Sequence, residues 1–210
     1  MRILIFTLTL LLGAQQLMAQ SWSDMLKKAA TEVADKVTGG KLTAASLNGS
    51  WSYTAPAIKL ESSNALNEIG STAVESIVTP KLERAYAIVG LKAGAGRFTF
   101  NEDKSFTAAL GRAKNLGGTY EFDPETHTLT LSFAHSKFKL GKVSGKAYIS
   151  GNELQLVFPV TKLVEIVTKL GSSIASLNTI ASLLESYDDV YLGFGFSRST
   201  TNENSNNSIN

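Results

Sequence analysis

Residues 97–108 read RFTFNEDKSFTA, and this short stretch decides the fold. Apolar and polar residues alternate along 97–100, a polar turn follows at 101–104, and the alternation resumes at 105–108. A period of two on both sides of a short polar turn predicts a β-hairpin. One face of this hairpin is expected to carry Phe98, Phe100, Phe106 and Ala108.

The same layout occurs twice more along the chain. Residues 118–133 contain two alternating runs around the turn at 123–126, and residues 144–158 contain another two. Single alternating runs at 50–54 and 191–197 bring the expected number of strands to about eight. The chain is therefore predicted to be mainly β, with successive strands antiparallel.

A meander of this size is expected to close into an up-and-down β-barrel, because closure removes two exposed edge strands. The interior of an eight-stranded barrel is either filled by side chains or holds one small ligand. The aromatic residues predicted to line it, which are also the candidate ligand-binding residues, are Trp51, Phe98, Phe100, Phe106, Tyr120, Phe122, Phe133, Phe158 and Phe194. Alternation alone does not identify which face of each strand points inward.

Three other stretches have helical periodicity. Residues 22–37 predict an amphipathic N-terminal helix. Residues 64–78 predict a helix that ends before Pro80, and Pro80, with Thr79 as its N-cap, is expected to begin a second short helix. Residues 161–186 predict another pair of helices separated by a glycine-serine break. We expect both pairs to be helical hairpins that cap the barrel, because neither has the run of about 20 apolar residues that a membrane span needs.

The first residues have the pattern of a secretory signal peptide. Arg2 supplies a positive charge, residues 3–12 are apolar, and Ala19 is a small residue at the expected cleavage site. We therefore expect a mature chain that begins at Gln20 and is periplasmic or secreted. The chain has no cysteine, so its stability must come from packing and not from disulfides.

The remaining 191 residues (210 minus 19) are enough for one core and too few to require two domains. We divide the chain into a signal peptide at 1–19, one domain at 20–198 and a polar tail at 199–210 that is expected to be disordered. The formal net charge is only +2, which gives no electrostatic reason to expect nucleic-acid binding. The lysines between 137 and 146 are expected to be a solvated strand face.

The chain offers few residues for catalysis or metal binding. His127 and His135 flank one predicted strand, about 26 Å apart, which is too far to share a metal ion. His127 lies in a predicted turn and is expected to be solvated. The serines have no histidine at a recognisable motif spacing, and the carboxylate pairs lie mostly in turns. The sequence thus predicts a protein that is not an enzyme and uses no cofactor.

Several stretches together resemble a known family. They are Gly49-Ser50-Trp51-Ser52-Tyr53-Thr54 with Pro56, Phe98–Asp103 as FTFNED, residues 118–126 as GTYEFDPET, and Tyr187-Asp188 followed by Tyr191-Leu192-Gly193-Phe194. Over residues 22–198 the chain resembles an uncharacterised family of lipocalin-like secreted proteins from Bacteroidetes. The resemblance implies a lipocalin-like barrel and no particular activity. Lipocalins often pair the first-strand tryptophan with an arginine, and Arg198 is the candidate partner of Trp51.

Two functions remain open at this point. One is a carrier or sensor for a small apolar or amphipathic ligand, gated by the helical caps. The other is a structural or protein-interaction module whose barrel is filled by its own aromatics. The orientation of the strand phenylalanines separates them, because a barrel with all of them inside has little room for a ligand. We expect a monomer, and the sequence identifies no protein partner.

Overall fold

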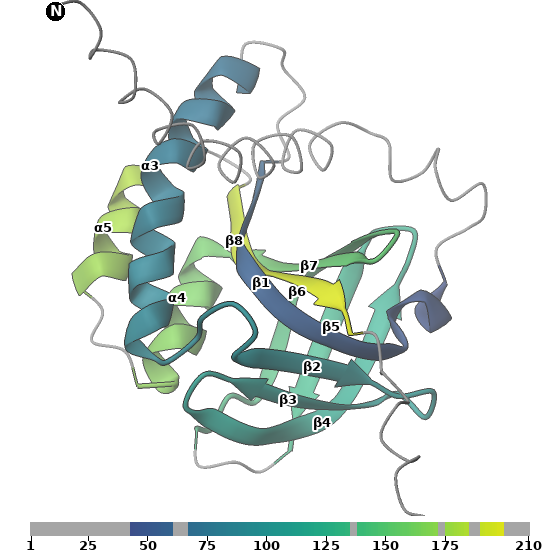
Figure 1. Ribbon diagram of the computed structural model, residues 1–210. Helices are drawn as coiled ribbons and strands as arrows, with labels where there is room; N and C mark the ends of the chain where they lie inside the picture. The colour runs from purple at the N-terminus through teal and green to yellow at the C-terminus, as the bar shows by residue number, and fades with distance from the viewer. Residues whose placement is uncertain (1–42, 61–66, 135–137, 172–174, 185–189, 200–210) are drawn as a thin grey trace, which may run out of the picture.

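The computed structural model describes residues 43–60, 67–134, 138–171, 175–184 and 190–199 (Figure 1). The predicted signal peptide, the predicted helix at 22–37 and the tail from residue 200 onward lie outside these described residues. His135 lies outside them too.

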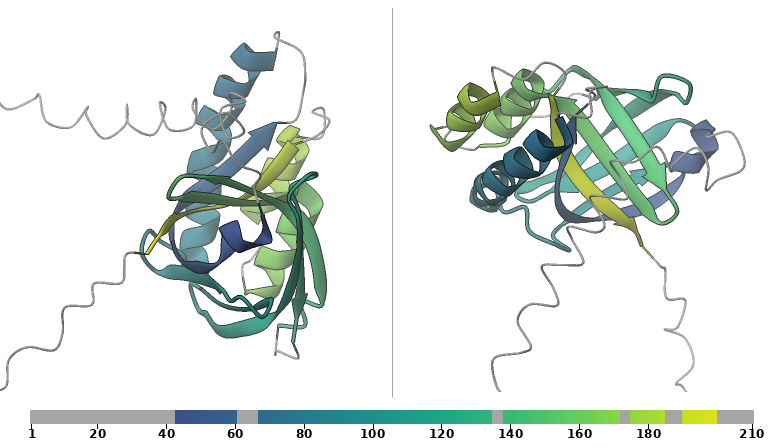
Figure 2. Two further views of the ribbon diagram at one scale, coloured as in Figure 1. Left: turned by 90° about the vertical axis from the view of Figure 1, so that its right-hand side faces the viewer. Right: turned by 90° about the horizontal axis from the view of Figure 1, so that it is seen from above.

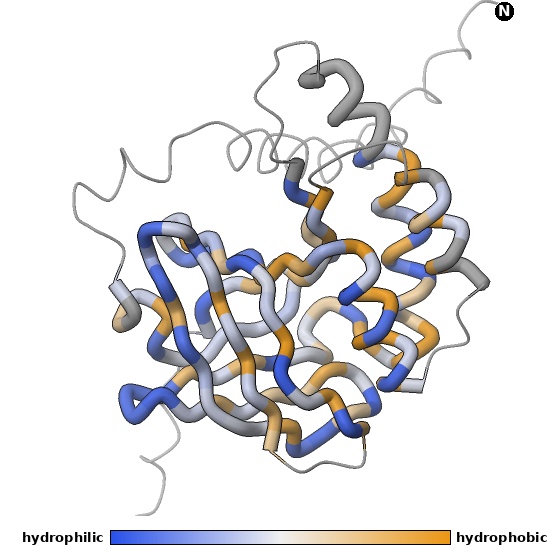
Figure 3. The backbone as a smooth tube through the Cα atoms, turned by 180° about the vertical axis from the view of Figure 1, so that it is seen from behind, coloured by the Kyte–Doolittle hydropathy of each residue, from blue (hydrophilic) through white to orange (hydrophobic). Residues whose placement is uncertain are grey.

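Eight antiparallel strands form a closed barrel in which each strand pairs with its neighbours in sequence and β1 pairs with β8 (Figure 1). The strands are β1 Gly49–Leu60, β2 Gly96–Phe100, β3 Ser105–Leu110, β4 Ala113–Asp123, β5 Thr128–Phe133, β6 Lys142–Ser150, β7 Glu153–Pro159 and β8 Val190–Arg198. Hydrophobic and hydrophilic residues alternate along these strands, as Figure 3 shows. The predicted up-and-down barrel and its three hairpins are confirmed.

Strand β1 is longer than the sequence predicted. The alternation indicated a strand at 50–54, but β1 continues to Leu60 through Pro56. Its first residues pair with both β2 and β8, whereas beyond Ser52 the register of β1 is with β8 alone. Proline has no N–H to donate. It is tolerated there because β1 has a partner strand on only one side beyond Ser52, so one edge of the strand makes no ladder hydrogen bonds.

Helix α3 (Asn67–Ile88) continues through Pro80 without a break. The sequence predicted two helices separated at this proline, because proline lacks an N–H and its ring crowds the preceding turn. That prediction is wrong. Val78 before the proline and Leu82 after it are both fully buried, so the packing of one continuous apolar face outweighs the local cost.

The other predicted pair of helices is confirmed as α4 (Val160–Lys169) and α5 (Ala175–Leu184). Together with α3 they lie side by side at one end of the barrel (Figures 1 and 2). Their buried residues join the barrel interior in a single hydrophobic core, which includes Tyr86, Leu163 and Leu177. At the opposite end a short 3-10 helix, η1 (Ala44–Leu47), buries Leu47 against the same core. Both ends of the barrel are therefore covered by helix. Among the described helices, none has the length and hydrophobicity of a membrane span.

Candidate functional site

The nine aromatic residues predicted to line the barrel all lie on the inner parity of their strands. Register places Phe98 opposite Ala108 and Phe100 opposite Phe106, so the predicted shared face of that hairpin is confirmed. Seven of the nine have 3% or less of their surface exposed. The other two, Phe122 and Phe133, are partly buried and pack against the same core.

These rings contact one another as a continuous cluster. Phe98 stacks on Phe100 and Phe106, with ring centroids 5.2 and 5.5 Å apart, and meets Phe196 edge-on at 5.9 Å. Phe133 meets Phe106 edge-on at 5.1 Å. Such offset and edge-to-face pairs are the arrangements that aromatic rings prefer in packed cores.

The sequence analysis missed two members of this cluster, Tyr53 and Phe196. Tyr53 contacts Phe194 and Phe196 with centroids 6.4 and 6.0 Å apart. Each lies two residues after a predicted interior residue, Trp51 or Phe194, so the period of two already indicated both. Their two strands, β1 and β8, are neighbours only because the barrel closes.

The end of the barrel near η1 is closed by Trp51. Its indole N–H donates a buried hydrogen bond of 2.8 Å to the carbonyl oxygen of Leu47. Arg198 lies over the indole ring, 4.2 Å from its centroid, which confirms the predicted pair. The hydroxyl of Tyr120 donates to Asn48 Oδ1 at 3.0 Å. These contacts fasten η1 across the opening.

The opposite end is closed by Tyr86 of α3. Its ring packs on Phe194 with centroids 5.0 Å apart, and its hydroxyl donates a buried hydrogen bond of 2.9 Å to the carbonyl oxygen of Gly193. Burial raises the pKa of Tyr86 well above its usual value, with a smaller contribution from Tyr53. The hydroxyl is therefore held neutral as a hydrogen-bond donor.

The packing of the interior decides what the barrel can hold. A cavity large enough for a ligand would leave parts of its walls accessible to a molecule the size of water, even if the cavity had no mouth. Seven of the nine aromatic wall residues have almost no accessible surface. The rings contact one another and so fill the space between these walls.

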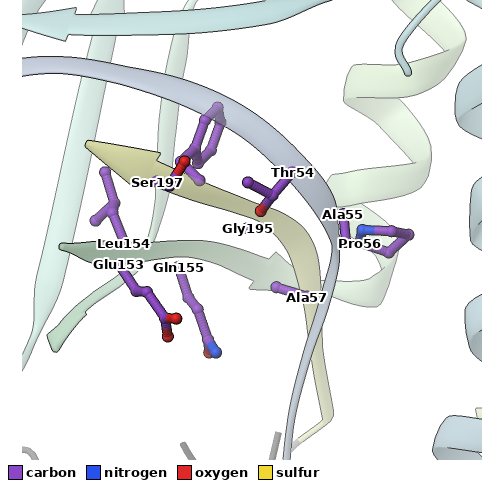
Figure 4. A pocket seen from close by; sticks show the side chains of 10 residues that line it. Thr54, Ala55, Pro56, Ala57, Glu153, Leu154, Gln155, Gly195 and Ser197 are labelled. Atoms are coloured by element: carbon purple, nitrogen blue, oxygen red, sulfur yellow. The ribbon is translucent and has the colours of Figure 1, made fainter. Parts of the chain in front are cut away.

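A hollow does occur on the outer face of the barrel (Figure 4). Its lining comes from β1, β7 and β8, namely Thr54, Ala55, Pro56, Ala57, Glu153, Leu154, Gln155, Gly195, Phe196 and Ser197. Gly195 is paired with Ala55 on one side and with Gln155 on the other, so small residues form the floor where larger side chains would fill the space. None of the nine candidate ligand-binding residues lines this hollow, and the alternation along the strands does not predict it.

The prediction that His127 is solvated holds only in part. It is half-buried in the turn between β4 and β5, and its ring stacks on Tyr148 with centroids 4.8 Å apart. Among the described residues, no cluster of three histidine, aspartate or glutamate side chains could hold a metal ion.

An eight-stranded antiparallel barrel that is opened by a Gly-x-Trp strand and closed by an arginine on the tryptophan defines a lipocalin-like domain. The chain belongs to the lipocalin-like domain family DUF4923, whose family model matches residues 23–198. This confirms the family resemblance found in the sequence.

Comparison with curated proteins finds no match. Among solved structures, the chain is similar to a DUF4847 family protein from Bacteroides vulgatus ATCC 8482. The identity is 16%, the TM-score is 0.36, and the likeness covers 74% of this chain and 96% of that one. We draw no functional conclusion from that likeness.

Proposed function

We propose that this protein is an exported, non-enzymatic module whose barrel is a packed scaffold and not a ligand carrier. The observation that supports this proposal is the packing of the interior aromatic rings against one another. Phe98 contacts Phe100, Phe106 and Phe196. A small-molecule carrier needs a pocket of about 300–1,000 Å³. The protein then acts through its outer surface, as a structural or interaction module of the cell envelope.

The carboxylates in the hairpin turns support a structural role over a catalytic one. Asp103 accepts hydrogen bonds from the backbone N–H and the hydroxyl of Ser105, and these bonds lower the pKa of Asp103. Asp123 accepts from the Thr126 hydroxyl and the Glu125 N–H, which lowers its pKa in the same way. Both carboxylates are thus ionised and stabilise their turns by hydrogen bonds. A carboxyl group that acts as a general acid needs a raised pKa instead.

The packed scaffold is tested by native mass spectrometry and by fluorescence of a small apolar probe. The wild-type mature protein, purified gently from its own host, is expected to be bare and to leave the probe unchanged. Phe98→Ala removes the central ring and is expected to open a dry apolar cavity that takes up the probe. Thr107→Ala, on the exposed face of β3, is the matched control and is expected to behave as wild type. A bound mass that leaves the wild type on denaturation would establish the carrier instead.

The proposed export is tested separately by cell fractionation with N-terminal sequencing. The protein is expected outside the cytoplasm with Gln20 as its first residue. A cytoplasmic protein that retains Met1 would contradict this part of the proposal.

A further inference from the structure

Helix α3 carries a row of apolar and basic residues on the side that faces away from the barrel. The row consists of Ile77, Lys81, Arg84 and Ile88, which are spaced by four, three and four residues and so lie one above another along the helix. Ile77 is 53% exposed and Ile88 is 45% exposed, and no other large apolar residue in the described part of the chain is exposed to this extent. The helix thus presents apolar surface that its own fold leaves in water.

The opposite side of α3 is the one that packs on the barrel. Val78, Leu82 and Tyr86 are buried there, whereas Pro80 and Ala87 lie beside the row and are exposed. In the right-hand view of Figure 2, α3 and α5 are the outermost elements on their side of the molecule. The described elements therefore leave the outer face of α3 uncovered.

The positive charge of the row lies between its two isoleucines. Neither Lys81 nor Arg84 makes an ion pair with a described residue. Glu83, the only acid in residues 77–96, projects about 100° around the helix from Arg84. Burial and, to a smaller extent, the Glu83 carboxylate raise the pKa of Tyr53, which places Glu83 on the flank of α3 nearer the barrel. The row itself therefore carries only positive charge.

The basic surface continues past the end of the helix. The backbone N–H of Arg112, in the turn between β3 and β4, donates a 2.8 Å hydrogen bond to the carbonyl oxygen of Val89. This turn therefore lies against the C-terminal end of α3. Arg112 and Lys92 are both exposed. Ile88 is consequently bordered by basic residues beyond the helix end as well as by Arg84 one turn earlier.

The charge of this face disfavours a second copy of the chain as its partner. In a two-fold contact centred on the row, Ile77 of one copy would meet Ile88 of the other. Lys81 would then meet Arg84, and these like charges repel each other. A complementary partner must instead be negatively charged and must also accept the isoleucines.

An anionic lipid surface meets both requirements. Its headgroup phosphates attract lysine and arginine, and the boundary between headgroups and acyl chains accepts apolar side chains. The row is a ridge about 17 Å long, and a flat bilayer contacts a ridge without a matched groove. An acidic protein would need a pocket shaped for each isoleucine. The lipid surface is therefore the simpler fit.

We propose that the outer face of α3, together with Lys92 and Arg112, docks on the surface of an anionic lipid bilayer. The cations contact the headgroup phosphates, and Ile77 and Ile88 enter the boundary with the acyl chains. This goes beyond the proposed function and does not depend on it, because the outer face of α3 is the same whether the barrel is packed or holds a ligand.

Co-sedimentation of the purified mature protein with lipid vesicles tests the docking. Binding is expected to vesicles that contain phosphatidylglycerol and not to vesicles of phosphatidylcholine alone, and added salt is expected to weaken it. Arg84→Glu is expected to lower the partition coefficient by about 20-fold, because each cation near an anionic surface contributes about fivefold and a reversal counts nearly twice. An absence of binding to phosphatidylglycerol vesicles would overturn the proposal.

Lys104→Glu is the matched control for the charge reversal. Lys104 is exposed in the turn between β2 and β3, at the η1 end of the barrel, and its reversal changes the net charge by the same amount. This variant is expected to bind vesicles as the wild type does. Equal losses in Lys104→Glu and Arg84→Glu would show that net charge, and not the face of α3, governs binding, and would refute the docking face.

The isoleucines separate a lipid surface from an acidic protein. Ile88→Ser is expected to weaken vesicle binding several-fold, because less apolar surface enters the acyl boundary. The same variant is expected to bind polyglutamate, a polyanion without an acyl layer, as well as the wild type does. Binding to polyglutamate without binding to vesicles would assign the face to an acidic protein and contradict the lipid contact.

A fluorescent label reports which face meets the bilayer. The chain has no cysteine, so an environment-sensitive dye at Ala87→Cys, exposed beside the row, is unique. Its emission is expected to shift to the blue when phosphatidylglycerol vesicles are added. The same dye at Thr107→Cys, exposed on β3, is the control and is expected to keep its emission. Vesicle binding that shifts only the Thr107→Cys label, or neither label, would place the contact elsewhere on the molecule and sink the proposal.

Discussion

The guanidinium of Arg198 lies over the indole of Trp51 and also donates hydrogen bonds to the carbonyl oxygens of Asn48, at 2.8 Å, and Ser46, at 3.3 Å. Arg198 ends the last strand, Trp51 lies near the start of the first, and Ser46 belongs to η1. One side chain thus joins the two ends of the barrel sheet to the helix that covers its opening.

Arg198→Ala is expected to lower the free energy of unfolding by about 2 kcal/mol, because a partly buried cation–π contact and two charge-assisted hydrogen bonds are lost. Arg198→Lys keeps the charge but not the planar fork, so an intermediate loss is expected. The control is Arg97→Ala on the exposed face of β2, which should change stability by less than about 0.5 kcal/mol. Urea unfolding measures all three. Equal losses for the two alanine variants would show that Arg198 does not lock the barrel.

Tyr86 makes the stability of the protein fall at alkaline pH. Its folded pKa is raised well above 10 by burial, whereas in the unfolded chain it returns to about 10. Its contribution is fully present below about pH 10. Above that, the unfolded state binds fewer protons than the folded state, so stability decreases by up to about 1.4 kcal/mol per pH unit.

Tyr86→Phe is expected to reduce this alkaline slope and to cost about 1 kcal/mol at neutral pH through the lost hydrogen bond to Gly193. Some slope should persist, because burial also raises the pKa of Tyr53. Urea midpoints from about pH 8 to 11 measure it. Tyr191→Phe, partly exposed on the outer face, is the control. An unchanged slope in Tyr86→Phe would contradict the buried hydroxyl.

The two glycines of β8 are expected to respond differently to alanine. A methyl group on Gly193 would overlap the carbonyl oxygen of Leu156, so Gly193→Ala should destabilise the protein by about 3 kcal/mol through forced strand displacement. On Gly195 the methyl would lie 3.2 Å from the Ala55 carbonyl oxygen and 3.6 Å from Thr54 Oγ1, where small shifts suffice. Gly195→Ala should therefore cost less than about 1 kcal/mol. Thermal unfolding compares them, and the reverse order would mean that β7 and β8 are spaced differently.

Pro80→Ala is expected to stabilise the protein by about 2 kcal/mol. A proline inside a helix costs about 3 kcal/mol, of which up to about 1 kcal/mol is offset because proline also restricts the unfolded chain. The control is Ala87→Gly on the exposed face of the same helix, which should lower stability by about 1 kcal/mol. If Pro80→Ala weakened the protein, α3 would not be the single continuous helix described here.

Most of the barrel was predictable because its information is local. Each hairpin has its own alternation and its own turn residues, and Asp123 accepts the backbone hydrogen bond from Glu125 that such turn aspartates form. The helices and the length of β1 were less predictable. Pro80 predicted a helix break, but the buried face of α3 continues through it. The alternation ended at residue 54, but pairing with β8 carries β1 on through Pro56.

The candidate site, too, was predictable only where the information is local. Period two identified all nine interior aromatics, since alternation places them on one face of each strand. It could not show whether that face is filled, because filling depends on rings from distant strands such as Phe98 and Phe196 meeting across the barrel. Tyr86 belongs to helix α3, and tertiary contacts, not a local sequence pattern, place that helix at the end of the barrel.

The sequence by itself determined that this chain is a lipocalin-like meander of eight strands, because alternation, turns and the Gly49-Ser50-Trp51 motif are short-range features. Only the tertiary structure decided that Arg198 closes the barrel on Trp51 and that aromatic rings occupy its interior. Those outcomes depend on which residues far apart in the chain come into contact, and contact is set by closure of the sheet and not by any local pattern.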